Sequence, residues 1–161
     1  MYLVGIIEKT CNTIDTSRVL EEKDIFKKCT ITKMNQNNLL NFKNVKFDVL
    51  IINYKIDLEK CDDYLNIILN SAKIIILNID YKENIKIVEN VKAQVITYGF
   101  NKKSTVTITS CEENNIILEL QREIISLNNM RLKNMEIKNA YETGKNGVHF
   151  FASVCILKII I

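Results

Sequence analysis

“KIIILNIDYKENIKIVENVKAQVITYGF”, residues 73–100, contains the pattern from which the architecture of the chain can be worked out. Two apolar, β-rich runs flank a short charged segment, so the order strand, helix, strand is predicted. Neither run alternates with polar residues, and uninterrupted apolar strands are typical of parallel sheets that are covered on both faces. The pattern therefore predicts a βαβ unit with a right-handed crossover, and hence an α/β fold.

Three further strands are predicted before this unit. The run “FDVLIINY”, residues 47–54, is apolar between polar boundaries, so we expect a central strand that is buried on both faces. Residues 3–7 form a similar run near the start of the chain, and “CTITK”, residues 29–33, is short but β-rich. Together these runs predict a parallel sheet of the P-loop or Rossmann-like type, with helices on both faces and three layers in all.

The segments between the strands are predicted to supply helices and one loop. Residues 57–72 carry apolar side chains at spacings of three and four, which predicts an amphipathic helix with Asp57 as its N-cap. Residues 13–29 have an imperfect helical period, and we expect a helix there as well. The Asn-rich residues 34–46 are predicted to form a loop.

The pattern changes after Phe100. Residues 104–137 alternate apolar and polar side chains with a period of two, and Asn pairs at 114–115 and 128–129 suit turns because Asn tolerates left-handed conformations. This half is predicted to be an antiparallel β-meander added to the parallel sheet. For residues 146–161 we expect a helix and then an apolar end, with strand propensity, that is tucked in or paired with another chain.

The composition fits one folded domain that spans residues 1–161. Of these residues, 47% are hydrophobic and 25% are charged, which provides enough apolar surface for a packed core. The net charge is +3, but basic and acidic residues are mixed along the chain, and no basic block with interleaved aromatic residues stands out. No nucleic-acid partner is therefore expected.

The cysteines and the hydropathy indicate a cellular compartment. Five widely spaced cysteines without a CxxC pair argue against a disulfide framework and against a metal site, and for reduced thiols. No apolar stretch reaches the roughly 18 residues needed to span a membrane. The charges at Glu8 and Lys9 follow too short an apolar run for a signal peptide. We expect a soluble, cytoplasmic protein without a membrane partner.

Two short motifs end the predicted strands within residues 73–100. Asn78-Ile79-Asp80 follows the first strand, and “TYGF”, residues 97–100, closes the second about twenty residues further on. In this order and spacing the chain resembles the central, ATP-binding domain of the Mur ligase family, which carries an Asn-x-Asp-Asp strand end and then a Thr-Tyr-Gly-Phe strand end. The resemblance implies a domain of that fold.

The resemblance continues on both sides of these motifs. Asn53 and Asp57 match the family's Thr-Asn-x-x-x-Asp-His stretch after a central strand, although Leu58 stands in place of the histidine. Gly147 and His149 are similar to the family's Gly-x-His-Asn helix. The resemblance is to the central domain alone, without the family's substrate-binding and C-terminal domains.

The family's phosphate loop, Gly-x-x-Gly-x-x-Gly-Lys-Thr/Ser, has only a shortened counterpart here. Gly5 is followed by three residues and then by Lys9-Thr10, so the loop is too short, and Glu8 occupies the position of the last glycine. That carboxylate would repel a triphosphate, and a residue with a Cβ resists the backbone conformation of the cradle. We interpret the segment as a degenerate P-loop.

The residues that would contact a nucleotide, if the resemblance extends to binding, are Lys9, Thr10, Asn53, Asp57, Asn78 and Asp80. Each also has a structural interpretation, as a helix entry, a strand end or a helix cap. The family's catalytic parts are missing: residues 47–54 contain no glutamate, and position 58 is not a histidine. We therefore expect no catalytic residues and no phosphoryl transfer.

Three functions fit these observations. The first is a pseudoenzyme, a degenerate Mur-ligase-like domain that acts as a structural or protein-partner-binding module, with a homo-oligomer as one form of it. The second is a residual nucleotide-binding protein for ATP or ADP, with Mg²⁺ as the accompanying ion. The third is one part of a split amide ligase whose other parts belong to another polypeptide.

Overall fold

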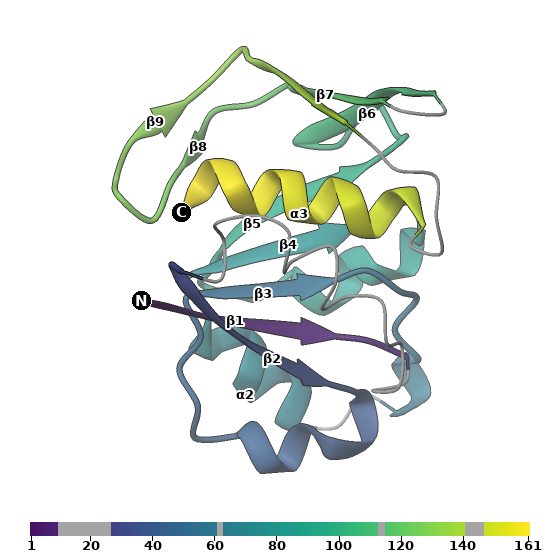
Figure 1. Cartoon of the computed structure of the whole chain (residues 1–161). Helices are drawn as coiled ribbons and strands as arrows, with labels where there is room; N and C mark the ends of the chain where they lie inside the picture. Colours follow the sequence, from purple (N-terminus) through teal and green to yellow (C-terminus); the bar gives the residue numbers. More distant parts are fainter. Residues whose placement is uncertain (10–26, 61–62, 113–114, 141–146) are drawn as a thin grey trace.

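Within the described part of the chain, eight strands form one mixed sheet in the order β10-β7-β6-β5-β4-β3-β1-β2 (Figure 1). The structure is a computed structural model and describes residues 1–9, 27–60, 63–112, 115–140 and 147–161. The strands are β1 (Tyr2–Ile7), β2 (Cys29–Met34), β3 (Val49–Ile52), β4 (Ile74–Asn78), β5 (Gln94–Gly99), β6 (Val106–Glu112), β7 (Asn115–Leu120) and β10 (Glu136–Ala140).

Parallel pairing runs through most of this sheet. Each pair of neighbours from β2 across to β6 is parallel, whereas β7 and β10 are antiparallel additions at one edge. This arrangement confirms the predicted α/β fold with an antiparallel addition in the C-terminal half. The strands predicted within residues 3–7, 29–33, 47–54 and 73–100 are all present.

Strand β3 shows that the sheet is covered on both faces. All four of its residues are buried, and successive side chains point to opposite faces. Val49 and Ile51 belong to the core cluster that contains α3 (Val148–Ile160), while Leu50 and Ile52 belong to the cluster that contains α2 (Asp63–Ser71). The uninterrupted apolar run thus follows from two helical layers, which Figure 1 shows on opposite sides of the strands.

Helix α3 is largely apolar because most of its residues are buried. Phe150 to Leu157 and Ile160 are all buried. A small hairpin of β8 (Ile124–Ile125) and β9 (Arg131–Leu132) covers the C-terminal end of the helix. The amide of Leu127 donates to the carbonyl of Ile160 at 2.7 Å, which satisfies one of the carbonyls that a helix end leaves unpaired.

The tail therefore ends as a helix, and the strand alternative for its last residues is wrong. Ile160 is fully buried, and the flanking Ile159 and Ile161 pack against the same core cluster. Of the two arrangements expected for the apolar end, the structure has the one that is tucked in. The physical reason is the hairpin β8–β9, whose Asn128 side chain also donates to the carbonyl of Ile161 at 3.1 Å.

The predicted loop over residues 34–46 needs correction, because it contains the 3-10 helix η1 (Gln36–Phe42). Asn35 accepts a hydrogen bond from the Asn37 amide at 3.0 Å, and its own amide donates to the Asn38 side chain at 2.8 Å. The asparagines that indicated a loop thus form a capping box.

The helix predicted over residues 57–72 is also different. A 3-10 turn, η2 (Leu58–Lys60), precedes α2, and residues 61–62 lie outside the described ranges. Asp57 caps the turn η2, since its side chain accepts from the Glu59 amide at 3.2 Å, whereas the amphipathic helix α2 begins six residues later, at Asp63. The short helix expected between β4 and β5 is the 3-10 helix η3 (Lys82–Val88).

The meander is interrupted, since β8 and β9 form a separate two-stranded sheet between β7 and β10. Asn129 has a φ of 60° at the tip of this hairpin, as the Asn pair predicted. The helix predicted over residues 13–29 falls mainly on residues 10–26, which lie outside the described residues, and so does Asn114.

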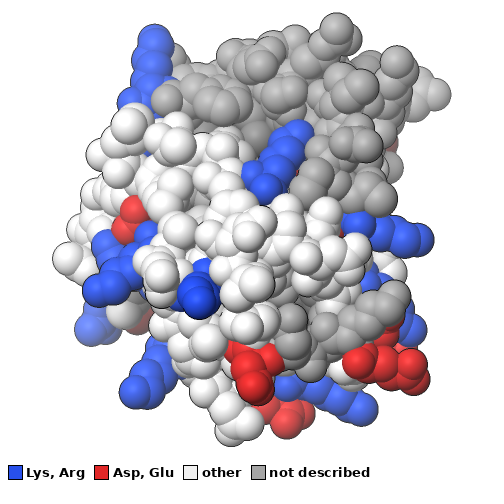
Figure 2. All heavy atoms as spheres, turned by 90° about the horizontal axis from the view of Figure 1, so that it is seen from below, with Lys and Arg blue, Asp and Glu red and all other residues white. Residues whose placement is uncertain are grey.

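The surface of the described residues carries mixed charge. Figure 2 shows basic side chains spread around the periphery of one face, with no continuous basic patch among the described residues there. None of the helices within the described ranges is long and apolar enough to cross a membrane.

Candidate functional site

The strand order reverses beside β1. Strand β2 lies on one side of β1, whereas β3 and the strands after it lie on the other. The connections that leave β1 and β3 therefore diverge, and open α/β sheets bind ligands in the crevice that this leaves at the carboxyl ends of the strands. The β1/β3 switch point is thus the first place to look for a site.

A cavity of about 710 Å³ opens at this switch point, and we refer to it as the switch-point cavity. Lys9 follows β1, residues 54–59 follow β3, and Tyr81 and Glu83 follow β4, while Gln36 opens η1. All of them line the cavity. Its volume lies in the range of sites that hold small molecules, roughly 300–1,000 Å³.

The wall that follows β3 is fixed by side chains that bind its backbone. Gln36 pairs twice with Asp57, donating to its carbonyl at 3.0 Å and accepting from its amide at 3.1 Å. The amide of Ile56 donates to Asn84 Oδ1 at 3.0 Å, and the amide of Glu59 donates to Asp57 Oδ1 at 3.2 Å. The wall is therefore ordered before any ligand arrives.

Among the described residues, five charged side chains line the cavity, namely Lys9, Lys55, Asp57, Glu59 and Glu83. Lys55 Nζ lies 2.9 Å from Glu83 Oε1, and this hydrogen bond lowers the pKa of Glu83. Glu83 therefore stays ionised at neutral pH. Because both partners are largely exposed, the pair contributes little to stability, but it places one negative and one positive charge at the mouth.

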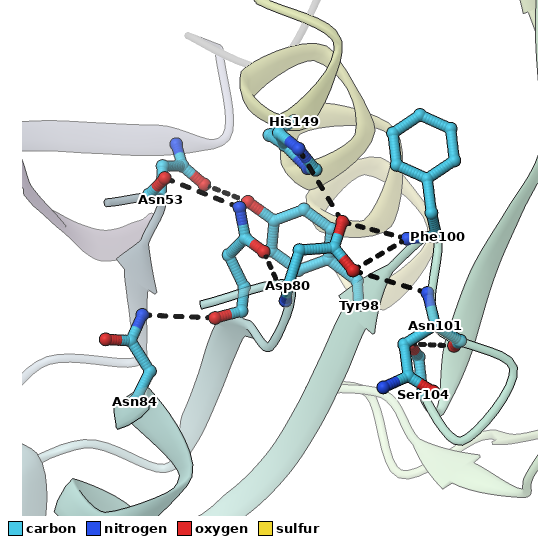
Figure 3. A network of polar contacts seen from close by, with 9 residues as sticks. Asn53, Asp80, Asn84, Tyr98, Phe100, Asn101, Ser104 and His149 are labelled. Atoms are coloured by element: carbon cyan, nitrogen blue, oxygen red, sulfur yellow. Dashed lines mark hydrogen bonds and ion pairs between the residues drawn. The ribbon is translucent and has the colours of Figure 1, made fainter. Parts of the chain in front are cut away.

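A second polar region lies further along the same edge, beyond the ends of β4 and β5 (Figure 3). We call it the strand-end network. Asn78 is fully buried, and its Oδ1 accepts from the Asp80 amide at 3.0 Å. Asn84, also fully buried, donates to the carbonyls of Tyr54 at 2.9 Å and Asn78 at 3.1 Å. Asn84 thereby joins the network to the cavity wall.

Asp80 ties the end of β4 to the turn after β5. Its carboxylate accepts from the amides of Phe100, at 2.9 Å to Oδ2, and Asn101, at 3.3 Å to Oδ1. Gly99 makes this approach possible, because a Cβ at that position would lie 2.5 Å from Asp80 Oδ1. Gly99 also has a φ of +149°, which residues with a side chain rarely adopt.

The other side of the network packs against the start of α3. The Tyr98 hydroxyl donates to Asn53 Oδ1, and burial raises the pKa of Tyr98 well above its usual value. His149 Nε2 lies 3.6 Å from Asp80 Oδ2. Burial lowers the pKa of His149, and the Asp80 charge opposes that effect. His149 is therefore mostly neutral at pH 7.

Two buried nitrogens of this network, Asn53 Nδ2 and His149 Nδ1, have no hydrogen-bond partner among the described residues. Phe100 packs edge-on against the His149 ring, with centroids 5.6 Å apart. The network is therefore only partly covered: Asn78 and Asn84 are fully buried, whereas the side chains of His149 and Asp80 remain 28% and 25% exposed. Within the described ranges, no three His, Cys, Asp or Glu side chains converge to a metal site.

The structure separates the residues that the sequence grouped together. Lys9 and Asp57 line the cavity, whereas Asn53, Asn78 and Asp80 lie in the strand-end network and contact each other or the protein backbone. Thr10 lies outside the described residues.

Several residues that line the cavity were not predicted from the sequence. Tyr54 and Tyr81 lie two and three residues beyond the ends of β3 and β4. That position is the signal that could have found them, since side chains just beyond parallel strands meet at one edge. Gln36 comes from η1, a segment predicted to be a loop. Its pairing with Asp57, 21 residues away, depends on the fold alone.

No protein-family model matches the chain, and no curated protein is significantly similar to it. Function is therefore inferred from the geometry of the cavity and of the network.

Proposed function

We propose that this chain is a Mur-ligase-like α/β domain that binds a small molecule in the switch-point cavity and does not carry out phosphoryl transfer. The observation that carries the proposal is the position of the cavity. It opens where the strand order reverses, and its walls come from the residues that follow β1, β3 and β4.

The absence of phosphoryl transfer is supported by what surrounds the end of β1. The amide of Glu8 donates to the Met34 carbonyl at 2.9 Å, so the first amide beyond β1 extends the strand pairing and does not face a phosphate. Leu58, in place of the family's histidine, offers no metal ligand. Asn78 and Asp80, the best match to the family's motifs, have backbone partners of their own.

Calorimetric titration with ATP, ADP and adenosine tests the proposal. Tyr81 is 37% exposed at the cavity, so Tyr81→Ala should weaken any binding about tenfold through the loss of aromatic contact. Ile85→Ala is the matched control, because Ile85 is 43% exposed on η3 and does not line the cavity. Its affinity should equal that of the parent chain.

The opposite result has a clear meaning. If none of the three compounds gives heat up to millimolar concentration, small-molecule binding of this class is excluded, and the structural or partner-binding module becomes the better proposal. Binding that responds equally to both variants would place the ligand elsewhere. Hydrolysis of ATP by the purified chain would contradict the claim that chemistry has been lost.

A further inference from the structure

The charges and donors of the switch-point cavity distinguish between classes of ligand. We infer that the cavity selects an uncharged ring compound and disfavours polyphosphates, an inference that rests on the proposed function. Three features of the lining carry it: the balance of charge, the state of the backbone amides, and the aromatic side chains.

The balance of charge among the lining residues is negative. Among the described residues that line the cavity, two lysines stand against three carboxylates, which gives 2 − 3 = −1. Lys55 is hydrogen-bonded to Glu83, so these two charges offset each other, and Lys9, Asp57 and Glu59 are the other charged residues in the sum. A triphosphate that entered would meet more negative than positive charge among these residues. Because Lys55 and Glu83 are largely exposed, added salt weakens this repulsion.

Four backbone amides of the described residues in and beside the cavity wall already have acceptors. Sites for phosphate present successive unpaired N–H groups to the anion. Here the amides of Ile56, Asp57 and Glu59 all donate to side-chain oxygens of the protein. The amide of Glu8 donates to Met34 on β2. A phosphate could accept hydrogen bonds from these amides only after their present hydrogen bonds were broken.

The remaining surface of the lining favours a ring. Tyr54 and Tyr81 provide aromatic faces, and Leu58, at 37% exposure, adds apolar surface at the mouth. Covering exposed apolar surface is favourable, and aromatic side chains add a preference for stacked or edge-on rings. The carboxylates around them can accept hydrogen bonds from the N–H and O–H groups of an uncharged ligand.

A charge series with one ring tests the inference: adenosine, AMP and ATP, titrated calorimetrically without added metal. We expect ATP to bind at least about tenfold more weakly than adenosine, with AMP between them. Glu59→Gln removes one carboxylate and should narrow the ratio of adenosine to ATP affinity about threefold. Glu89→Gln, an exposed glutamate away from the cavity, should leave the ratio unchanged.

The outcomes separate the two proposals. ATP bound as tightly as adenosine, or more tightly, would overturn the charge inference and leave small-molecule binding at the cavity intact. A ratio that moves equally in Glu59→Gln and Glu89→Gln would also overturn it, since the charge that matters would not belong to the cavity. No binding of any member of the series would overturn both proposals.

Discussion

The switch-point cavity and the strand-end network use the same kinds of residue at the same edge of the sheet, yet the cavity surrounds open space, whereas most polar groups of the network are paired within the protein, and in that sense the network is the closed region. In the cavity, the side chains after β1 and β3 surround about 710 Å³ of space. In the network, the carboxylate of Asp80 accepts from the amides of the next turn, and Asn78 and Asn84 are fully buried.

The topology explains the difference. Connections diverge at the β1/β3 switch point, whereas β3, β4 and β5 follow one another across the sheet, so the turn after β5 lies directly beside the end of β4. Polar groups at neighbouring strand ends then become partners of each other. A polar residue at the end of a strand is thus available to a ligand only if the adjacent connection does not already pair with it.

The largest expected effect is a loss of folding stability caused by a substitution in the strand-end network. Gly99→Ala forces a Cβ to within 2.5 Å of Asp80 at a φ of +149°, so it should displace the carboxylate and destabilise the fold by about 4 kcal/mol. Urea unfolding measures this loss. Gly147→Ala is the control, because nothing lies within 4 Å of a Cβ there, and a comparable loss in that variant would refute the explanation.

The second prediction concerns the residue that joins the two regions. Asn84→Ala removes the partner of the Ile56 amide and of the Tyr54 and Asn78 carbonyls, and should cost about 3 kcal/mol of stability. Because the cavity wall loses its anchor, affinity for a cavity ligand should fall too.

Exposed Asn90 supplies the control for this change, since Asn90→Ala should alter neither stability nor affinity. Urea unfolding and calorimetry on both variants make the comparison. A variant Asn84→Ala that loses stability but keeps full affinity would show that the network and the cavity are independent.

The sheet could be predicted from the sequence because the residues of each parallel strand carry a recognisable pattern on their own, without reference to other segments. The run at 47–54 is apolar on both faces, and no helical arrangement of so short a segment explains that pattern better. The resulting β3 pairs with β1 and β4 in the expected parallel sense. Burial on two faces imposes a composition that can be recognised without knowing the partners.

The division between cavity and network could not be predicted, because it depends on contacts between distant segments. Asn78 ends β4 and Asp57 comes after β3, and both carry short polar side chains. In the fold, however, the carbonyl of Asn78 accepts a hydrogen bond from Asn84, whereas the backbone of Asp57 pairs with Gln36 in the wall of an open space. Likewise, residues 34–46 were predicted to be a loop, but the capping box of Asn35 begins the 3-10 helix η1 there. Asn residues indicate an interruption, but not which partner satisfies them.

The smallest expected effect is a pH dependence of the closed region. Burial lowers the pKa of His149 below that of the unfolded chain, so between the two values the unfolded state binds more protons and stability rises with pH. The stabilising contribution is complete above about pH 6.5, the usual value for histidine, and is lost as the pH falls through the lower pKa of the folded state.

In His149→Gln, the free energy of unfolding should depend less on pH. The rest of the strand-end network and the cavity should be unchanged. Urea unfolding of both proteins at pH 5 and pH 7.5 measures this dependence, and the difference between them isolates His149 from the carboxylates that titrate in both. The opposite result is a free energy of unfolding that, relative to the variant, is higher at pH 5 than at pH 7.5. It would mean that protonated His149 forms a stabilising ion pair with Asp80, 3.6 Å away, and that the site tolerates the charged imidazole. In that case Asp80 and His149 would be available to a ligand, and they would count among the candidate ligand-binding residues at this edge of the sheet.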